Sequence, residues 1–297
     1  MIRYRYIYLM LLPAVALVFL FHYYTLSGWL IAFTNYQVGI SIWKSPWAGL
    51  EQFRSFFQQS SEYMYVIRNT LVMNLSVIFV NLIAGLTCAI LIHELRSKRF
   101  GKFMQMISFF PFFISWVVVY SFLFSLFAAS TGAVNETLVK AGVIQEGINL
   151  LGDERYSWIL IICLQLWKYL GFNVIIFISS IASISNDQYE AADLDGAGRW
   201  GKVRYITVPN LVPTCVILLI MNVGWVLTSD FELFYLFINP TNWPTMNTLD
   251  MYIYNYGLQL GNFSYATAVG IVKTFVSLIL VISANSISKK LTGKSIL

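Results

Sequence analysis

The chain contains six long apolar runs that are almost free of charged residues. A helix needs roughly 20 apolar residues to cross the hydrocarbon core of a membrane, which is about 30 Å thick. Only helices and closed barrels satisfy their backbone hydrogen bonds in lipid, and these runs are too long and continuous for barrel strands. We therefore predict an all-α integral membrane protein. Its six transmembrane helices are expected at about 7–34, 66–93, 103–128, 156–184, 211–235 and 264–288.

Composition and continuity favour one membrane domain over residues 1–297. Hydrophobic residues make up 58% of the chain and charged residues only 11%, which is typical of a membrane protein. Two of the predicted helices contain a lysine, Lys168 or Lys273, but long apolar stretches on both sides still predict that they span. The first apolar run is too long for a secretory signal peptide and lacks a small-residue cleavage site, so we expect it to remain as the first helix.

The distribution of basic residues predicts the orientation. Of the 19 lysines and arginines, 12 fall in termini and loops on one side of the predicted helices. Because basic residues are enriched on the cytoplasmic side, we expect both termini to be cytoplasmic. The net charge of +5 is then a topology signal and does not indicate nucleic-acid binding. The 12 residues are Arg3, Arg5, Arg96, Lys98, Arg99, Lys102, Arg199, Lys202, Arg204, Lys289, Lys290 and Lys294.

The loops on the other side contain many aromatic residues. Residues 35–65 suggest an amphipathic segment at the membrane interface, and residues 236–262 suggest a structured cap. The cysteines lie inside the predicted helices, at Cys88, Cys163 and Cys215, with spacing for neither a metal site nor a disulfide. We expect no metal and no cofactor in this chain.

The loop at 186–209 contains many charged residues in a chain that has few. Its glycines Gly196, Gly198 and Gly201 match the G-x-G-x-x-G pattern of dinucleotide-binding proteins, and Lys202 completes a near match to a P-loop. Both motifs require a hydrophobic strand directly before the first glycine. Here an acidic, helix-forming stretch precedes it, and its carboxylates would repel phosphate. Nucleotide binding by this loop is therefore rejected.

A third pattern in the same loop is more specific. Glu-Ala-Ala is followed by a glycine six residues after the glutamate, an isoleucine ten residues later and a proline three residues after that. These residues, with the flanking D-G-A core, are Glu190, Ala191, Ala192, Asp195, Gly196, Ala197, Ile206 and Pro209. The pattern resembles the EAA motif of ABC-importer permease subunits, although Val203 and Val208 replace residues common in that family. Leu-Leu-Pro, Phe-Thr-Asn-Tyr and Gly-Leu-Glu-Gln-Phe near the N-terminus extend the resemblance to sugar-type permeases over nearly the whole chain.

The physical chemistry of the loop agrees with this resemblance. We expect Glu190 to begin a helix, where its carboxylate suits the positive end of the helix dipole, and the two alanines after it to let a partner approach closely. Gly196 permits an abrupt turn into a second short helix, Arg199–Tyr205. Pro209 and Pro213 are expected to stop this helix and to start the next transmembrane helix. The resemblance implies a type I importer-like fold, in which the two short helices seat in a cleft of a cytoplasmic ATPase subunit. A plain solvated linker would explain the charges but not the spacing.

Polar and aromatic residues inside the later helices are candidates for lining a transport pathway, because intramembrane ionisable groups are costly and are usually functional. They are Trp167, Lys168, Asn173, Asn222, Trp225, Asp230, Glu232, Tyr235 and Lys273. Two interpretations stay open. The charged residues line the cavity, or Lys273 pairs with Asp230 or Glu232 while Lys168 extends toward the membrane surface. Unpaired lysines in the cavity would favour an acidic sugar such as a uronate oligomer.

We therefore predict a non-enzymatic permease subunit of an ATP-driven importer in a bacterial cell membrane. The resemblance implies a second, related permease, two ATPase subunits that hold ATP and magnesium, an extracellular or periplasmic solute-binding protein and a carbohydrate substrate. An importer permease for a non-sugar solute is the alternative. A membrane-embedded enzyme would need clustered acids and histidines, but His22 and His93 are far apart. A lone secondary transporter would show inverted repeats, which the sequence lacks, and would leave the EAA pattern unexplained.

Overall fold

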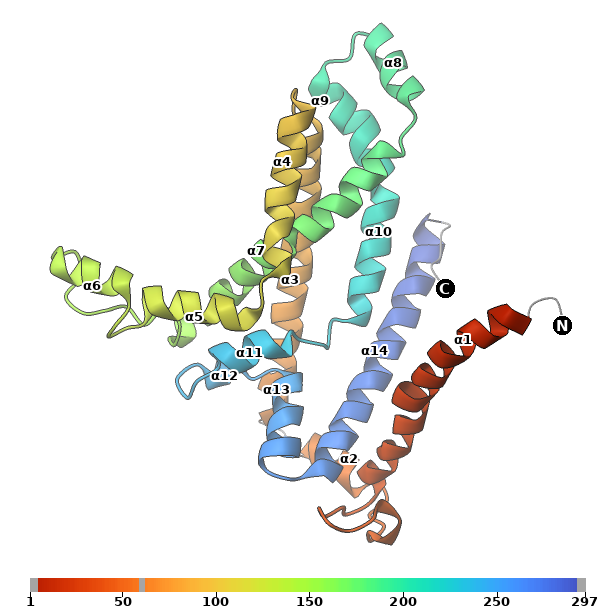
Figure 1. Cartoon of the computed structure of the whole chain (residues 1–297), viewed down its shortest axis with the longest axis vertical. Coiled ribbons are helices and arrows are strands. Elements are labelled where there is room, and N and C mark those ends of the chain that lie inside the picture. Colours follow the sequence, from red (N-terminus) through yellow and green to blue (C-terminus); the bar gives the residue numbers. More distant parts are fainter. Residues whose placement is uncertain (1–4, 59–61, 293–297) are drawn as a thin grey trace. The chain divides into compact units, whose positions relative to one another are not determined.

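The computed structural model describes residues 5–58 and 62–292, which are mostly helical (Figure 1). This part of the chain contains no β-strand, only an isolated antiparallel bridge between Thr34 and Trp47. The all-α prediction is therefore confirmed. Arg3 and Lys294, used to predict the orientation, lie outside the described residues.

The chain divides into two compact units. The first unit comprises Met1–Met64 and Tyr252–Phe275, and the second comprises Tyr65–Met251 and Val276–Leu297. The single-domain organisation expected from the sequence stays a prediction.

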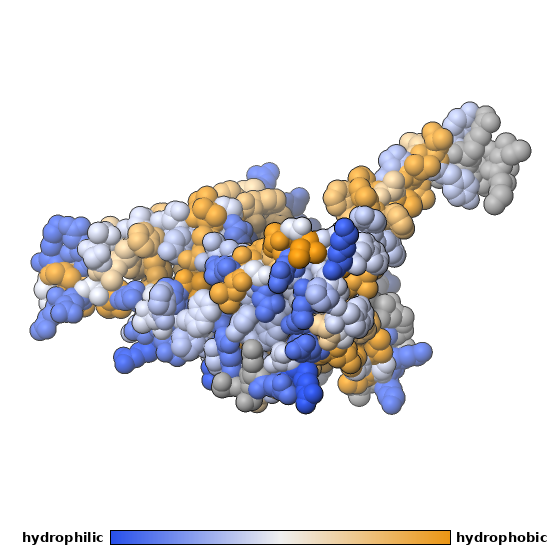
Figure 2. All heavy atoms as spheres, turned by 90° about the horizontal axis from the view of Figure 1, so that it is seen from below, coloured by the Kyte–Doolittle hydropathy of each residue, from blue (hydrophilic) through white to orange (hydrophobic). Residues whose placement is uncertain are grey.

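Five helical segments of the described residues are long and apolar enough to cross a membrane. They are Tyr8–Phe33, Glu62–His93, Glu154–Ala182, Arg199–Gly224 and Phe263–Lys290. A sixth span is present if a bent helix pair, Lys98–Phe113 with Trp116–Phe127, is counted as one. Many large apolar side chains are exposed on these helices, as the orange patches of Figure 2 show, which suits surfaces that face lipid.

The first unit contains the N-terminal helical run and the start of the last helix. The run passes without a break through α1 (Arg5–Val18), η2 (Phe19–Tyr23) and η3 (Tyr24–Phe33), and α14 comprises Phe263–Thr292. Ala32, Ala268 and Ile271 form a small core against Trp29, Phe33 and Phe53. The amphipathic segment predicted before the second span includes the short helices η4 (Ile42–Lys44) and α2 (Glu51–Gln58).

A tyrosine cluster also belongs to the first unit, near α13 (Leu249–Tyr254) and η7 (Asn255–Gln259). The hydroxyls of Tyr252 and Tyr265 lie 2.7 Å apart, and the hydroxyl of Tyr256 donates to Glu62 Oε2 at 2.8 Å. Burial, followed by the hydrogen bond to Glu62, raises the pKa of Tyr256 to about 12. Tyr256 therefore stays protonated, and so remains a donor, at neutral pH.

In the second unit, α3 (Glu62–His93), α7 (Glu154–Ala182) and α10 (Val208–Gly224) share an apolar core. Its buried members are Ala89, Val174, Phe177, Ile181, Leu211 and Leu218. Gly171 of α7 brings that helix against the backbone of Ser108 and Phe109, where a side chain would collide. Small residues of this kind allow close helix packing in membranes.

The helix predicted at 103–128 is not continuous. It is divided into α4 (Lys98–Phe109) with η5 (Phe110–Phe113), and α5 (Trp116–Phe127), which is bent by 93° from the first part. Pro111 has no N–H to continue the helical ladder, and Ile114 is extended. Ser115 then caps α5 by accepting a hydrogen bond from the Val118 N–H.

The helix predicted at 211–235 is present but shorter than expected, because α10 ends at Gly224 and a separate helix, α11, spans Phe231–Phe237. The segment between them is held by bonds from elsewhere in the second unit. Asn74 donates to the Val226 carbonyl at 2.8 Å, and the Ser229 N–H donates to Asp250 at 2.7 Å. These contacts satisfy backbone groups that a continuous helix would otherwise have paired.

Candidate functional site

The second unit contains a cavity of about 550 Å³ between α3, α7, α10 and the segment after α10. Side-chain amides dominate its polar lining: Asn74, Asn81, Gln165, Asn173 and Asn222. Its aromatic lining residues are Tyr169, Phe172 and Trp225. Amides that donate and accept, beside flat apolar rings, suit a solute that carries many hydroxyl groups and also has apolar faces.

Two of these amides have unused hydrogen-bonding atoms. Asn81 Oδ1 and Gln165 Nε2 are buried and have no hydrogen-bond partner. A buried polar atom without a partner costs about 1–3 kcal/mol. Both residues line the cavity, but these two atoms lie below its surface.

Lys168 does not point into this cavity. Its side chain is 8% exposed, its Nζ donates to the Ile114 carbonyl at the bend of the third span, and it lies 4.5 Å from the ring centroid of Trp116. Lys168 is not among the residues that line this cavity, and its buried side chain does not extend to the membrane surface; its predicted place in the pathway stays a prediction. The bend supplies the reason, because it leaves a carbonyl outside the helical ladder for the ammonium to bind.

The indole N–H of Trp116 continues this network by donating to Asp230 Oδ2 at 2.7 Å. The same oxygen accepts a hydrogen bond from the Tyr169 hydroxyl, also at 2.7 Å. Asp230 is thus hydrogen-bonded to Tyr169, which lines the cavity. Glu232 and Tyr235 are exposed on α11 and do not line the cavity.

The structure brings together only some of the predicted pathway residues. Asn173, Asn222 and Trp225 line the cavity, whereas Trp167 does not. Lys273 lies in the first unit, on α14, where it is partly buried, and its predicted role stays a prediction.

Sequence reasoning missed six polar or aromatic lining residues. They are Asn74, Asn81, Gln165, Tyr169, Phe172 and Thr228. A signal was present, because Gln165, Tyr169, Phe172, Asn173 and Ile176 recur at the spacing of one helix face. Asn74, Val77, Ile78 and Asn81 repeat the same pattern on α3.

The EAA loop forms two helical segments joined by a turn. The first, α8 (Asn186–Leu194), is capped by Ser185, so Glu190 lies in the middle of the helix and not at its start. Gly196 has a φ of +75°, a conformation that glycine adopts without steric cost, and the predicted turn is confirmed. Across this turn, Lys202 Nζ lies 2.5 Å from Asp193 Oδ1.

The second segment does not end at a proline. The short helix α9 (Arg199–Lys202) continues through η6 (Val203–Thr207) into α10, so the expectation that Pro209 and Pro213 stop it is wrong. Pro209 lies in the first turn of α10, where its missing N–H is tolerated, and a wider π-helical turn precedes it. The second segment of the loop is thus continuous with a spanning helix.

Apolar side chains protrude from the EAA loop. Leu194 is 91% exposed, Trp200 82% and Tyr205 74%. Exposed apolar side chains on a charged loop make it a candidate surface for contact with a partner. The sequence already contained this signal, as large apolar residues in an otherwise polar segment.

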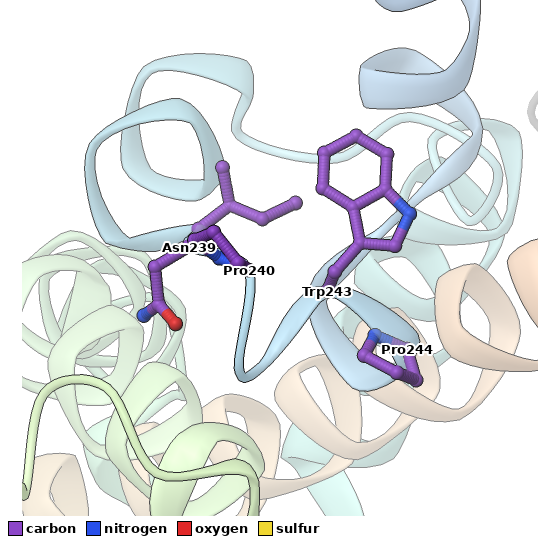
Figure 3. Close-up of a pocket in the computed structure, with 5 residues that line it drawn as sticks. Asn239, Pro240, Trp243 and Pro244 are labelled. Carbon is purple, nitrogen blue, oxygen red and sulfur yellow. The ribbon is translucent and has the colours of Figure 1, made fainter.

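A second hollow, of about 560 Å³, lies at the turn after α11. Ile238, Asn239, Pro240, Trp243 and Pro244 line it, with Pro240 and Trp243 on opposite sides (Figure 3). It offers fewer polar groups than the amide-lined cavity and is the weaker candidate for a polar solute. No group of three or more metal-ligating side chains occurs within residues 5–58 and 62–292.

A protein-family model described as "binding-protein-dependent transport system inner membrane component" matches residues 81–293. The chain is also 38% identical over 293 residues to the polygalacturonan/rhamnogalacturonan transport system permease protein YteP of Bacillus subtilis (strain 168). That alignment covers 98% of this chain and 89% of YteP.

Two solved structures have the same fold. A chain of a bacterial ABC transporter involved in the import of the acidic polysaccharide alginate gives a TM-score of 0.87 at 33% identity, covering 98% of this chain and 97% of that chain. The alginate transporter in complex with an alginate pentasaccharide-bound periplasmic protein gives 0.87 at 32% identity, with 99% and 97% covered.

Proposed function

The chain belongs to the family of binding-protein-dependent transport system inner membrane components, and we propose that it forms half of the translocation pathway for an oligosaccharide. The observation that carries this proposal is the amide-lined cavity between α3, α7 and α10. Sugars present hydroxyl groups to amides and apolar ring faces to aromatic side chains, and this lining supplies both.

The substrate class we favour is an acidic, uronate-containing oligosaccharide. Support comes from YteP, named for polygalacturonan and rhamnogalacturonan, and from the alginate transporter structures. Lysines give this substrate class no support, because Lys168 is bound to the Ile114 carbonyl and no lysine or arginine occurs among the residues that line the cavity. The side-chain amides of the lining residues are donors for a carboxylate.

The EAA loop is proposed to couple this pathway to ATP hydrolysis in a partner. With both termini cytoplasmic, α8 and α9 face the cytoplasm, where their exposed apolar side chains seat in an ATPase subunit. Because α9 continues into α10, a displacement of the loop is transmitted along a spanning helix that lines the cavity through Asn222. ATP and magnesium then belong to the two ATPase subunits, and this chain is not itself an enzyme.

The assembled importer contains a second, related permease and a solute-binding protein, and it lies in the bacterial cell membrane. The alginate transporter complex with its periplasmic protein supports the binding-protein partner. A non-sugar solute is the alternative, but the names of the relatives give it no support.

Affinity purification of the tagged chain tests this proposal. We expect the detergent-solubilised complex to contain a second permease and an ATPase, identified by mass spectrometry. In proteoliposomes with the cognate binding protein, Asn222→Ala and Trp225→Ala should raise the apparent KM for tetragalacturonate. A chain that purifies without an ATPase, or cavity variants with unchanged KM, would contradict the proposal.

A further inference from the structure

Tyr169 lines the cavity, and its hydroxyl proton is already donated in a hydrogen bond within the protein. The hydroxyl donates to Asp230 Oδ2 at 2.7 Å, and the indole N–H of Trp116 donates to the same oxygen at 2.7 Å. A phenol that donates its proton to a carboxylate keeps its oxygen lone pairs for other partners. Tyr169 therefore presents an acceptor, and not a donor, to a solute in the cavity.

Trp116, which donates to Asp230, is also contacted by a lysine over its ring. Lys168 Nζ lies 4.5 Å from the Trp116 ring centroid and is anchored on the Ile114 carbonyl. A cation over the ring face and a carboxylate at the ring N–H both stabilise the indole in place. This arrangement fixes Asp230, and through it the orientation of the Tyr169 hydroxyl.

We propose that Asp230 is a positioning residue that makes Tyr169 an acceptor for a sugar hydroxyl and thereby determines how the solute lies in the cavity. A carboxylate, which only accepts, finds no donor at Tyr169 and is directed to the side-chain amide of Gln165, which lines the cavity one helical turn away on α7. The inference rests on the proposed function, since it specifies the orientation of the solute in that same cavity.

A double-mutant cycle in the reconstituted complex tests this role. We expect Asp230→Ala and Tyr169→Phe each to raise the apparent KM for tetragalacturonate about three- to tenfold, the range of one neutral hydrogen bond. In the Tyr169→Phe background, Asp230→Ala should change KM no further, because Asp230 acts through that hydroxyl. If the KM increases of the two single variants multiply in the double variant, or if Asp230→Ala leaves KM unchanged, the proposal is overturned.

Glu232→Gln is the matched control. It removes a carboxylate two residues away that is exposed and does not line the cavity, so KM should stay at the wild-type value. An equal rise in KM for Glu232→Gln would mean that charge near α11, and not the hydrogen bond to Tyr169, sets the affinity. If Asp230→Ala does not assemble, Asp230→Asn keeps one acceptor oxygen, and its smaller KM increase should likewise vanish in the Tyr169→Phe background.

A comparison of two substrates distinguishes contacts with the solute carboxylates from contacts with its hydroxyl groups. Gln165→Leu should raise KM for tetragalacturonate but not for its carboxyl-reduced analogue, whereas Tyr169→Phe should raise KM for both. The opposite pattern would place the carboxylate at Tyr169 and overturn the proposal. Failure of the proposed function is distinguishable, because the wild-type complex would then take up neither oligosaccharide.

Discussion

Gly85 of α3 packs directly against Asn173 of α7, so that a Cβ built on the glycine would lie 2.7 Å from the Cβ of Asn173. Asn173 lines the cavity, and the missing side chain at Gly85 therefore determines how closely two cavity walls approach. Small residues at such crossings allow membrane helices to pack tightly.

Gly85→Ala should destabilise the protein by about 1–3 kcal/mol, because the added methyl group must push α3 away from α7. Thermal unfolding of the purified complex should show a lower midpoint. Gly270→Ala in α14 is the control, since no atom lies within 4 Å of its new methyl group and alanine favours a helix by about 1 kcal/mol. Equal midpoints for the two variants would contradict this packing argument.

Gly196→Ala should weaken coupling without preventing membrane insertion. Its φ of +75° costs a residue with a side chain about 1–2 kcal/mol, although no atom lies within 4 Å of the added methyl group. We expect lower solute-stimulated ATP hydrolysis by the complex at an unchanged amount of assembled permease. Gly198 is exposed like Gly196 but has a φ of −70°, which alanine adopts without strain. The complex that contains Gly198→Ala should therefore hydrolyse ATP at the wild-type rate.

Lys168→Met should lower thermal stability, because it leaves the Ile114 carbonyl without its partner and removes the cation from the Trp116 ring. The expected loss is about 1–3 kcal/mol. The ratio of uptake of tetragalacturonate to that of its carboxyl-reduced analogue should stay unchanged, since the ammonium does not face the cavity. A selective loss of acidic-sugar uptake would show that Lys168 contacts the solute after all. Lys140→Met, which breaks only an exposed ion pair with Glu136, should leave the midpoint unchanged.

Asn135 should stabilise the segment around α6 (Ala133–Lys140). Its buried side chain donates to the carbonyls of Phe127, Ala128 and Ile148, and its Oδ1 accepts from the Ile148 N–H at 3.0 Å. Asn135→Ala should speed hydrogen exchange at the Ile148 amide, corresponding to about 1–3 kcal/mol of local stability.

The neighbouring Asn149 offers a control for that measurement. It is exposed, and its side chain accepts one hydrogen bond, from the Gly152 N–H at 3.0 Å. Asn149→Ala should therefore leave exchange at Ile148 close to wild type. Equal protection at Ile148 in Asn135→Ala and wild type would mean that the four hydrogen bonds of Asn135 contribute nothing to this segment.

The spanning helices could be predicted because their apolar length is a property of the local sequence. The turn at Gly196 was predictable for the same reason. The bend after η5 was not, since Pro111 and Ser115 also occur in unbroken membrane helices, where neighbouring groups satisfy the backbone. The end of α10 at Gly224 likewise depends on Asn74, which lies far away in the sequence.

The cavity was predictable only in part. Asn173 and Asn222 stand out as amides in apolar helices, yet Asn81 and Gln165 give the same signal, and only the packing of α3 against α7 shows that they share one cavity. The hydrogen-bond partner of Lys168 could not be inferred, because this carbonyl lies 54 residues away in the sequence, at a bend that the sequence does not reveal.

ATP-dependent uptake of labelled tetragalacturonate into proteoliposomes that contain the complete importer tests the central claim most directly. We predict saturable uptake that requires ATP, the binding protein and this chain, and that unlabelled tetragalacturonate competes away. Uptake that persists when this chain is omitted, or no uptake of any uronate or neutral oligosaccharide by the fully assembled complex, would contradict the account.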